Sequence, residues 1–273
     1  MQRYPLVRSS TRTQRTVCRE DTDRLDMAVR VRDMTTAQTV RIEPRFCGPA
    51  RSGHGGYVAG LVAAGFDGTD PVRVRLRKPP PLATELELSI DGTAGTLSGA
   101  GGLIADAATV DAAVLDDAWV EPVGPDEARA AEASFGGLVS HPFPTCFGCG
   151  PDNALGLRLR PGHLGDRRTA CTWRPAADLA GADGRVGTPF LWAALDCPGG
   201  WTMDLEGRPS VLGQLTVCVD AYPEAGEPCV VMGRRLGEDG RKTLTAATLY
   251  DSDGRILARA GHIWIAIDPV DFN

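Results

Sequence analysis

Two apolar segments, each preceded by a glycine-containing loop, predict two buried helices. The first covers residues 57–66 and the second covers residues 189–197. Neither segment has a polar face, so each helix needs burial on nearly all sides. Pro189 suits the first turn of a helix, where its missing N–H is not needed. Pro198 and the two glycines after it predict the end of the second helix.

Alternating apolar and polar positions after each helix predict antiparallel strands. This alternation places every second side chain on one face of a sheet, as expected for strands with one buried face. Turn residues between the segments predict hairpins. The first half has this alternation at 72–77 and 85–90 and strand-like sequence as far as 115; the second half repeats the strand at 215–220, and 229–232, 243–250 and 256–267 are further strand candidates.

The order of loop, helix and strands occurs twice, which indicates a duplicated unit. We assign residues 1–35 to a flexible N-terminal arm, 36–120 to the first half, 121–140 to a connector and 141–273 to the second half. Antiparallel strands around buried helices make an α+β fold. Neither half has the βαβ alternation of a doubly wound sheet.

Short motifs within this frame resemble those of the hotdog-fold thioesterase superfamily. Segment 141–153, which contains Cys-Phe-Gly-Cys-Gly, and the Gly-Leu-Arg-Leu-Arg stretch at 156–160 are similar to the entry of its phenylacetate-type members. The loop 53–56, Gly-His-Gly-Gly, resembles the loop before the hotdog helix, and Leu195-Asp196 resembles a pair on that helix. The resemblance implies a tandem double hotdog, with two antiparallel sheets each wrapped around a central helix.

The same resemblance implies an activity. It points to hydrolysis of acyl-CoA or acyl-carrier thioesters with no cofactor, and the chain is then an acyl-CoA thioesterase-like hydrolase. Hotdog proteins also include dehydratases and non-catalytic binders, so fold alone does not decide. A non-catalytic acyl-thioester binding protein and a structural fold with a closed cleft are the alternatives. Exposed edge strands and the habits of the fold favour a homodimer.

Asp196 is the strongest candidate for a catalytic residue. A carboxylate without partners in an apolar helix is expensive to bury, so Asp196 is expected to line a cavity. By resemblance it acts as general base towards water or as nucleophile on the thioester carbonyl. The alternative is a helix-end Asp that bonds nearby backbone. Aligning the helices at Tyr57 and Phe190 places Ala63 opposite Asp196, which predicts one working site.

The loop that contains His54 is the second candidate. Glycines let backbone N–H groups approach a ligand, and a helix N-terminus favours negative charge. By resemblance, the N–H of Gly56 or Tyr57 polarises the thioester carbonyl while His54 shapes the loop. Proton transfer by His54 and a plain glycine-rich turn are the alternatives. The predicted substrate-binding residues are Gly55, Gly56, Tyr57, Leu191, Gln214 and Thr216, and the acyl chain is expected beside the central helices.

Eight cysteines at irregular spacing do not form a disulfide scaffold. Cys146 and Cys149 form a two-ligand knuckle of the kind that binds zinc, but a structural site needs about four ligands. The sequence has no second Cys-x-x-Cys or His pair, and His163 and Cys171 are not typically spaced. We therefore predict no metal site. Without an export signal, reduced thiols in a cytoplasmic protein are expected.

Charge and hydropathy exclude two classes of partner. The net charge of −6 excludes a generally basic protein that coats nucleic acid. The arm carries +3 and the remainder −9, and a solvated arm is favoured over a nucleic-acid-binding one. No apolar run approaches the roughly 20 residues that cross a bilayer. Arginines at 73, 75 and 77 or at 234 and 235 are either holders of coenzyme A phosphates or solvent-facing strand residues.

Three other chemistries are disfavoured by motif. Ser52 lacks the Gly-x-Ser-x-Gly elbow of a serine hydrolase. The glycines at 99–102 lack the spacing of a dinucleotide loop. No histidine has an Asp five residues before it, and neither His54 nor His141 fits His-x3-Gly-x4-Pro. By resemblance to the hydratase-type hotdogs, which carry such motifs, addition or elimination of water is disfavoured.

Overall fold

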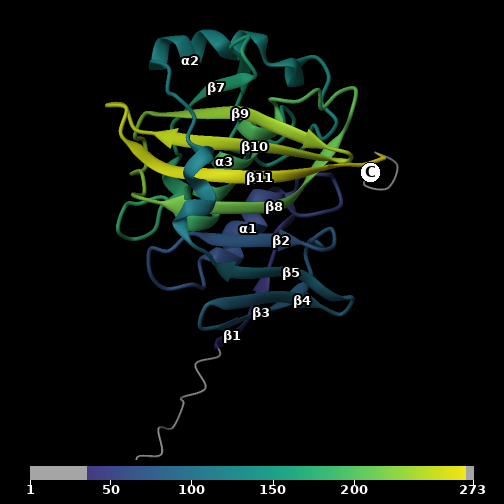
Figure 1. Ribbon diagram of the computed structural model, residues 1–273. Coiled ribbons are helices and arrows are strands. Elements are labelled where there is room, and N and C mark those ends of the chain that lie inside the picture. The colour runs from purple at the N-terminus through teal and green to yellow at the C-terminus, as the bar shows by residue number, and fades with distance from the viewer. Residues whose placement is uncertain (1–35, 269–273) are drawn as a thin grey trace, which may run out of the picture. The chain divides into compact units, whose positions relative to one another are not determined.

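The computed structural model describes residues 36–268 (Figure 1). The predicted arm, residues 1–35, lies outside this range. The strands of the described part are β1 (Thr36–Arg41), β2 (Val72–Leu76), β3 (Glu85–Asp91), β4 (Ala94–Gly99), β5 (Gly102–Thr109), β6 (Gly162–His163), β7 (Arg168–Trp173), β8 (Ser210–Val219), β9 (Cys229–Asp239), β10 (Lys242–Tyr250) and β11 (Ile256–Ala266). They form one antiparallel sheet in the order β1-β3-β4-β5-β2-β8-β11-β10-β9-β7-β6.

Helices cover both faces of this sheet. Helix α1 (Gly55–Ala63) and helix α3 (Thr188–Gly200) pack side by side on one face and form the main core with it. The 3-10 helix η2 (Ala112–Ala118) crosses the opposite face, in front of β10, β11 and β8 in Figure 1. Helix α2 (Pro125–Ala131) packs against β7. Short 3-10 helices complete the described chain: η1 (Pro44–Phe46), η3 (Glu132–Ser134), η4 (Gly136–Leu138) and η5 (Ala177–Leu179).

The α+β class is confirmed, but the prediction of two separate sheets is wrong. Strand β2 of the first half pairs with β8 of the second half, in a register that runs from Val72 opposite Val217 to Arg75 opposite Gln214. Each half would otherwise leave a row of unpaired backbone groups at this edge. Pairing the two edges satisfies those groups and makes one continuous sheet over both helices.

Two other sequence predictions are also corrected. Helix α3 extends beyond the predicted segment 189–197 and includes Pro198, but it ends at Gly200, within the Pro-Gly-Gly stretch that predicts its end; the carbonyl of Pro198 accepts a hydrogen bond from Thr169 Oγ1 at 2.7 Å. The strand-like sequence up to residue 115 ends earlier, because η2 begins after Asp111. The Asp111 side chain accepts from the Ala113 N–H at 2.8 Å and starts that turn. Leu115 is then buried against the opposite face of the sheet.

Two glycines bring α1 and α3 into close contact. A Cβ on Gly60 would lie 2.7 Å from both the Cα of Pro189 and the Cβ of Trp192, and a Cβ on Gly56 would lie 2.6 Å from the Cβ of Asp196. Their spacing of four residues places both glycines on one side of α1. The crossing therefore presses Asp196 against the first turn of α1.

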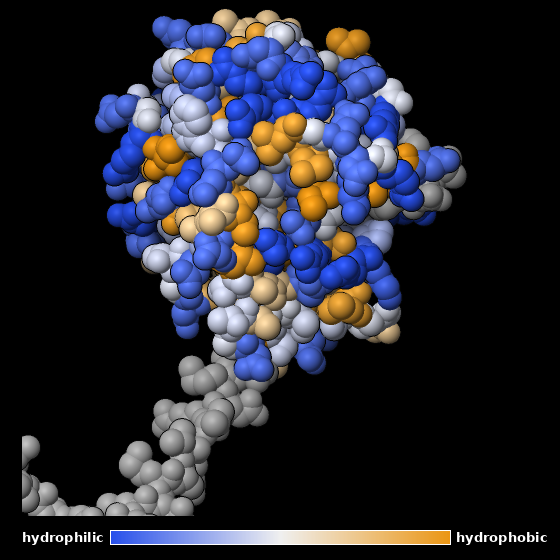
Figure 2. All heavy atoms as spheres, viewed as in Figure 1, coloured by the Kyte–Doolittle hydropathy of each residue, from blue (hydrophilic) through white to orange (hydrophobic). Residues whose placement is uncertain are grey.

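The surface of the described part is mixed in polarity. Figure 2 shows polar residues over most of one face, interrupted by small apolar groups near the middle of the sheet. Among the described residues, no helix is both long enough and apolar enough to cross a membrane.

A buried histidine beneath α3 predicts a pH-dependent stability. Burial lowers the pKa of His262 to about 4, although hydrogen bonds to the Thr245 and Leu195 carbonyls oppose this shift. The pKa of a histidine in the unfolded chain is near 6.5. The contribution of His262 to the free energy of unfolding is therefore fully present above that pH and decreases as the pH falls towards 4. We expect this residue to account for a loss of about 2 kcal/mol between pH 7.5 and pH 5.

Urea unfolding at the two pH values tests this expectation. His262→Gln is expected to lose the corresponding part of the pH dependence, whatever the absolute stability of the variant. An equal pH dependence in the wild-type protein and in the variant would show that His262 is not responsible.

Candidate functional site

Asp196 lies buried in α3, beside the N-terminus of α1. Its Oδ2 accepts a hydrogen bond from the Gly56 N–H at 2.7 Å, whereas its buried Oδ1 has no hydrogen-bond partner within the described chain. Burial raises the pKa of Asp196 to about 6, while the nearby His54 and the Gly56 N–H lower it. One carboxylate oxygen is thus fixed by the protein, and the other is buried without a hydrogen-bond partner in the described chain.

His54 joins this carboxylate to the start of α1. As N-cap, its Nδ1 accepts from the Tyr57 N–H at 3.2 Å, and the same nitrogen lies 3.6 Å from Asp196 Oδ2. Nε2 points the other way and lies 3.4 Å from the Sγ of Cys197. Burial lowers the pKa of His54, but Cys146 and Asp196 outweigh this effect, and the net direction is upward. The ring therefore bridges the carboxylate and a group of cysteines.

The backbone donors of the loop are used differently from the prediction. The N–H groups of Gly56 and Tyr57 already bind Asp196 and His54, so they do not face a substrate carbonyl. Gly55, the first residue of α1, lines the cavity described next, and its N–H has no acceptor within residues 36–268. Since the first-turn N–H groups of a helix have no partners inside it, Gly55 supplies the free donor of this loop.

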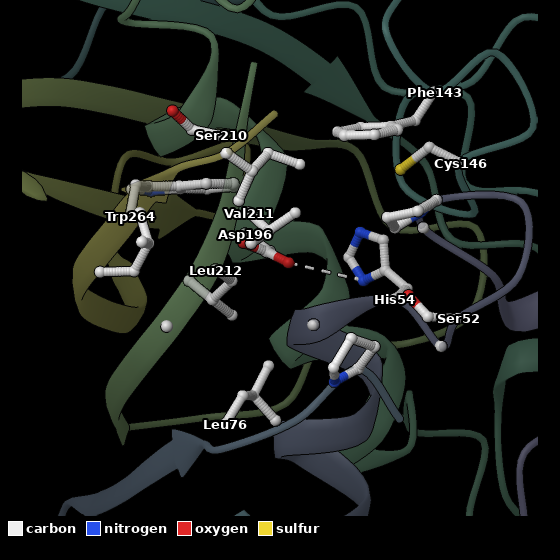
Figure 3. A pocket seen from close by; sticks show the side chains of 18 of the residues that line it. Ser52, His54, Leu76, Phe143, Cys146, Asp196, Ser210, Val211, Leu212 and Trp264 are labelled. Atoms are coloured by element: carbon white, nitrogen blue, oxygen red, sulfur yellow. Dashed lines mark ion pairs between the residues drawn. The ribbon is translucent and has the colours of Figure 1, made fainter. Parts of the chain in front are cut away.

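A cavity of about 290 Å³ opens beside His54 and Asp196 (Figure 3). Its polar inner end contains these two buried side chains and Gly55. Its walls are mainly apolar and come from the ends of β2, β8 and β11 and from the segment after α3, with Leu76, Trp201, Leu205, Val211, Leu212 and Trp264 among the lining residues. Its outer end reaches the exposed cations Arg77, Lys78 and Arg241. The cavity thus connects a buried carboxylate with the surface.

Of the six predicted substrate-binding residues only Gly55 lines this cavity, and Gly56, Tyr57, Leu191, Gln214 and Thr216 do not. Leu191 is fully buried in the core around α3. Gln214 and Thr216 alternate along β8 with Leu215, which packs in the main core, so they point to the opposite face of the sheet. There Gln214 accepts from Arg75 Nε at 3.0 Å. The cavity lies at the ends of the strands, and the predicted site on β8 does not fit this arrangement.

The two helices carry different residues at their matching positions. Ala63 is the ninth residue of α1, and Asp196 is the ninth residue of α3, which agrees with the alignment made on the sequence. The second position of α1 is Gly56, whose N–H binds the carboxylate, whereas the second position of α3 is Pro189, which has no N–H. Carboxylate and donor therefore occur together at one of the two related positions.

A group of sulfur atoms lies behind His54, and the sequence did not reveal it. The Sγ of Cys146 lies 3.8 Å from the Sγ of Cys197 and 3.8 Å from the Sγ of Cys149. The donor atoms of His54, Cys146 and Cys197 lie within 4.8 Å of one another, a grouping that suits a metal ion. Hydrogen bonds from the Cys149 and Cys197 thiols hold the pKa of Cys146 well below its usual value. His163 and Cys171, the extra ligands weighed from the sequence, lie on β6 and β7.

The loop after the connector places this knuckle over the first half of the chain. The Phe147 N–H donates to the Cys47 carbonyl at 2.7 Å, and the Phe147 ring meets the rings of His54 and Tyr57 edge-on. Segment 141–160 therefore covers the His54 loop, although about 90 residues separate them in sequence. The motif at 141–153 that carries the family resemblance is thus part of the site's wall.

Comparison with solved structures identifies the fold. No protein-family model and no curated protein sequence matches this chain. A proposed oleoyl thioesterase from Lactobacillus plantarum matches with a TM-score of 0.55 at 8% identity, over 87% of this chain and 98% of that one. A proposed thioesterase from Novosphingobium aromaticivorans matches with a TM-score of 0.57 at 18% identity, over 88% and 98%.

A third match carries the name of the fold itself. It is a hotdog-fold protein of unknown function from Alicyclobacillus acidocaldarius, with a TM-score of 0.56 at 16% identity, over 85% of this chain and 94% of that one. These likenesses confirm that the chain has the hotdog fold of thioesterase-superfamily proteins. At such low identity they concern the fold, and activity has to be argued from the site.

Proposed function

We propose that this protein hydrolyses acyl thioesters in the cavity beside Asp196. The observation that carries the proposal is the Asp196 carboxylate, which is buried and lines the cavity, with Oδ2 held by Gly56 and Oδ1 without a protein partner. A buried polar atom without a partner in a native site commonly serves a ligand or water. The hotdog fold shared with thioesterases supports this class of reaction.

The reaction follows from the positions of these groups. The thioester carbonyl oxygen lies at the Gly55 N–H, which stabilises the negative charge that develops there. Asp196 Oδ1 takes a proton from water, and the water oxygen forms a bond to the carbonyl carbon. When the tetrahedral intermediate collapses, the carbon–sulfur bond breaks and the proton on Asp196 passes to the leaving thiolate. The products are a carboxylic acid and a thiol, and no cofactor is needed.

The shape of the cavity favours a substrate with an apolar end and an anionic end. Aliphatic and indole side chains form its walls, and they suit an acyl chain better than a polar one. The exposed cations at its outer end suit the phosphates of coenzyme A. We therefore propose acyl-CoA as the substrate.

A panel of acyl-CoA thioesters tests the proposed activity. Release of free thiol is followed with a thiol reagent for acyl groups of increasing length, at enzyme concentrations far below substrate. Turnover that saturates with substrate supports the hydrolase. Saturable binding without release of thiol selects the acyl-CoA-binding alternative in its place.

The anionic end of the substrate gives a separate prediction. Lys78→Ala is expected to raise KM for acyl-CoA roughly three- to fivefold, as for the loss of one exposed charge contact, and to leave kcat unchanged. The corresponding acyl-pantetheine thioester lacks the nucleotide phosphates, so its KM is expected to stay the same. Lys242, the only other lysine of the chain, does not line the cavity, and Lys242→Ala serves as the matched control. An equal rise in KM for both substrates would argue against phosphate binding at Lys78.

A further inference from the structure

Four side chains from three separate parts of the chain converge behind the inner end of the cavity. They are His54 before α1, Cys146 and Cys149 in the loop over it, and Cys197 in α3, and all four are buried. We propose that these four side chains bind one zinc ion. The site goes beyond the proposed hydrolase activity, because no step of that reaction uses the ion. Its role is to fasten α3 and the loop 141–160 to the start of α1.

Three distances between donor atoms match those of a tetrahedral ion; the donor atoms of His54, Cys146 and Cys197 all lie within 4.8 Å of one another, and Cys149 joins this group through Cys146. With zinc–sulfur bonds of about 2.3 Å and zinc–nitrogen bonds of about 2.0 Å, tetrahedral ligands lie about 3.8 Å apart for two sulfurs and about 3.5 Å apart for sulfur and nitrogen. The Sγ of Cys146 lies 3.8 Å from those of Cys149 and Cys197, and Nε2 of His54 lies 3.4 Å from the Sγ of Cys197. Three thiolates and one imidazole are a frequent donor set of structural zinc.

The surroundings of these sulfurs differ from those of a cysteine that only fills space. A buried free cysteine usually packs as a small apolar side chain, as Cys171 does on β7 within the main core. The sulfurs of the group instead face one another and an imidazole nitrogen. Three cysteines and a histidine brought together from far apart in sequence are better explained by a shared ligand than by packing.

Further N–H groups around the sulfurs form an outer shell. The Trp201 Nε1–H donates to the Sγ of Cys149 at 3.2 Å, and His141 Nε2 lies 3.3 Å from the same atom. The Phe143 N–H donates to His141 Nδ1 at 2.9 Å, so the ring proton of neutral His141 is on Nε2 and points at the sulfur. Donors of this kind stabilise the negative charge of thiolate ligands.

His54 has a partner for its second nitrogen as well. The Tyr57 N–H donates to Nδ1, which places the proton of the neutral ring on Nε2 in the metal-free chain. Binding through Nε2 moves that proton to Nδ1, which ends the hydrogen bond from the Tyr57 N–H and leaves the proton facing Asp196 Oδ2, 3.6 Å away. A carboxylate behind a ligating histidine is the common outer-shell arrangement. Each thiol that binds the ion releases its own proton.

A glycine within the knuckle makes the approach of the ligands possible. A Cβ on Gly148, between the two cysteines of the motif, would lie 2.4 Å from the Sγ of Cys197 and 2.8 Å from Nε2 of His54. The knuckle backbone therefore runs directly against the two ligands from other segments. Since all four proposed ligands also line the cavity, the ion has a path from solvent to the site.

Metal analysis of the wild-type protein is the first test. Protein purified without chelators or metal-affinity resin is expected to carry one zinc ion per chain. Titration of the reduced, zinc-free protein with Co²⁺ is expected to give the intense near-ultraviolet charge-transfer band of thiolate-bound cobalt, which zinc then abolishes. Zinc is expected to raise the melting temperature, because a ligand of the folded state stabilises it.

Substitution of single cysteines tests which side chains bind the zinc ion. Cys146→Ser and Cys197→Ser are each expected to lose zinc and to weaken the cobalt band. Cys218→Ser is the control and keeps both, because Cys218 is half-buried against the second cluster on the other face of the sheet. The wild-type cobalt spectrum does not depend on whether a variant folds.

Three results would overturn the proposal. The first is a reduced wild-type protein that takes up neither zinc nor cobalt. The second is a cobalt band of full intensity in both ligand variants. The third is a disulfide that joins Cys146 to Cys149 or Cys197 in freshly purified protein, with no metal bound.

Discussion

Asp196→Asn is expected to lower kcat/KM for acyl-CoA hydrolysis by about 10²- to 10⁴-fold, the usual contribution of a positioned general base. Asn has the same shape, and its amide oxygen still accepts from the Gly56 N–H, so the crossing of α1 and α3 is preserved. The amide nitrogen then occupies the position of Oδ1, the oxygen without a protein partner. An amide nitrogen does not take a proton from water. The affinity for substrate is expected to change little, since the loss falls on the transition state.

A matched control separates this effect from a general effect of removing a charge. Asp220, just after β8, is exposed and does not line the cavity, so Asp220→Asn is expected to keep the wild-type rate. Urea midpoints of both variants show whether the fold is intact. Hydrolysis at the wild-type rate in a folded Asp196→Asn would exclude Asp196 as the base. Because Asp196 also lies 3.6 Å from the proposed zinc ligand His54, the zinc content of both variants is measured alongside the rate.

Most of the secondary structure was predictable because its signals are local. The alternation in segment 85–90 and the strand-like composition of segment 243–250 depend on neighbours within each segment, and both are strands. Helix α3 runs past the predicted segment 189–197 to Gly200, because Pro198 is included in its last turn against the local rule for proline. Pairing of β2 with β8 was also missed, since no local pattern states which edge strands meet.

The candidate site was predictable in part for the same reason. Asp196 stands out because buried helices normally carry apolar side chains. Departures from such local preferences are expected at functional sites. Gln214 and Thr216 were chosen by likeness to a strand motif, but the alternation with Leu215 already places them on the other face of the sheet. Which N–H of the loop stays free depends on Asp196 itself, which takes the Gly56 donor from 140 residues away.

The cysteine group is the part of the site that the sequence predicts least well. Cys146 and Cys149 are recognisable as half of a metal site, and the sequence gives no reason to add Cys197 or His54 to them. These residues meet only because the loop 141–160 folds over α1 and because α3 crosses α1 at close range. The grouping is a property of the helix crossing, and it depends on the same contacts that hold Asp196.

Gly60→Ala is expected to destabilise the protein by about 2 kcal/mol, in spite of the better helix propensity of Ala. The added Cβ would lie 2.7 Å from the Cα of Pro189 and the Cβ of Trp192 and 3.0 Å from the Thr188 carbonyl oxygen. None of these atoms can rotate away, so the helices must separate. Overpacking of this kind costs about 1–3 kcal/mol, and the gain of up to about 1 kcal/mol from replacing a helical Gly by Ala offsets part of it.

The same substitution is expected to lower kcat, because separating the helices moves Asp196 away from the Gly56 N–H that positions it. Urea unfolding and acyl-CoA turnover are measured together on Gly60→Ala and on Gly237→Ala, whose added Cβ meets no atom within 4 Å. The control is expected to match the wild type in both. If Gly60→Ala also matches the wild type, then the close crossing does not hold the carboxylate. If it is destabilised but keeps its full kcat, then Asp196 is positioned by its own helix alone. A joint loss links the packing of two apolar helices directly to the placement of the proposed base.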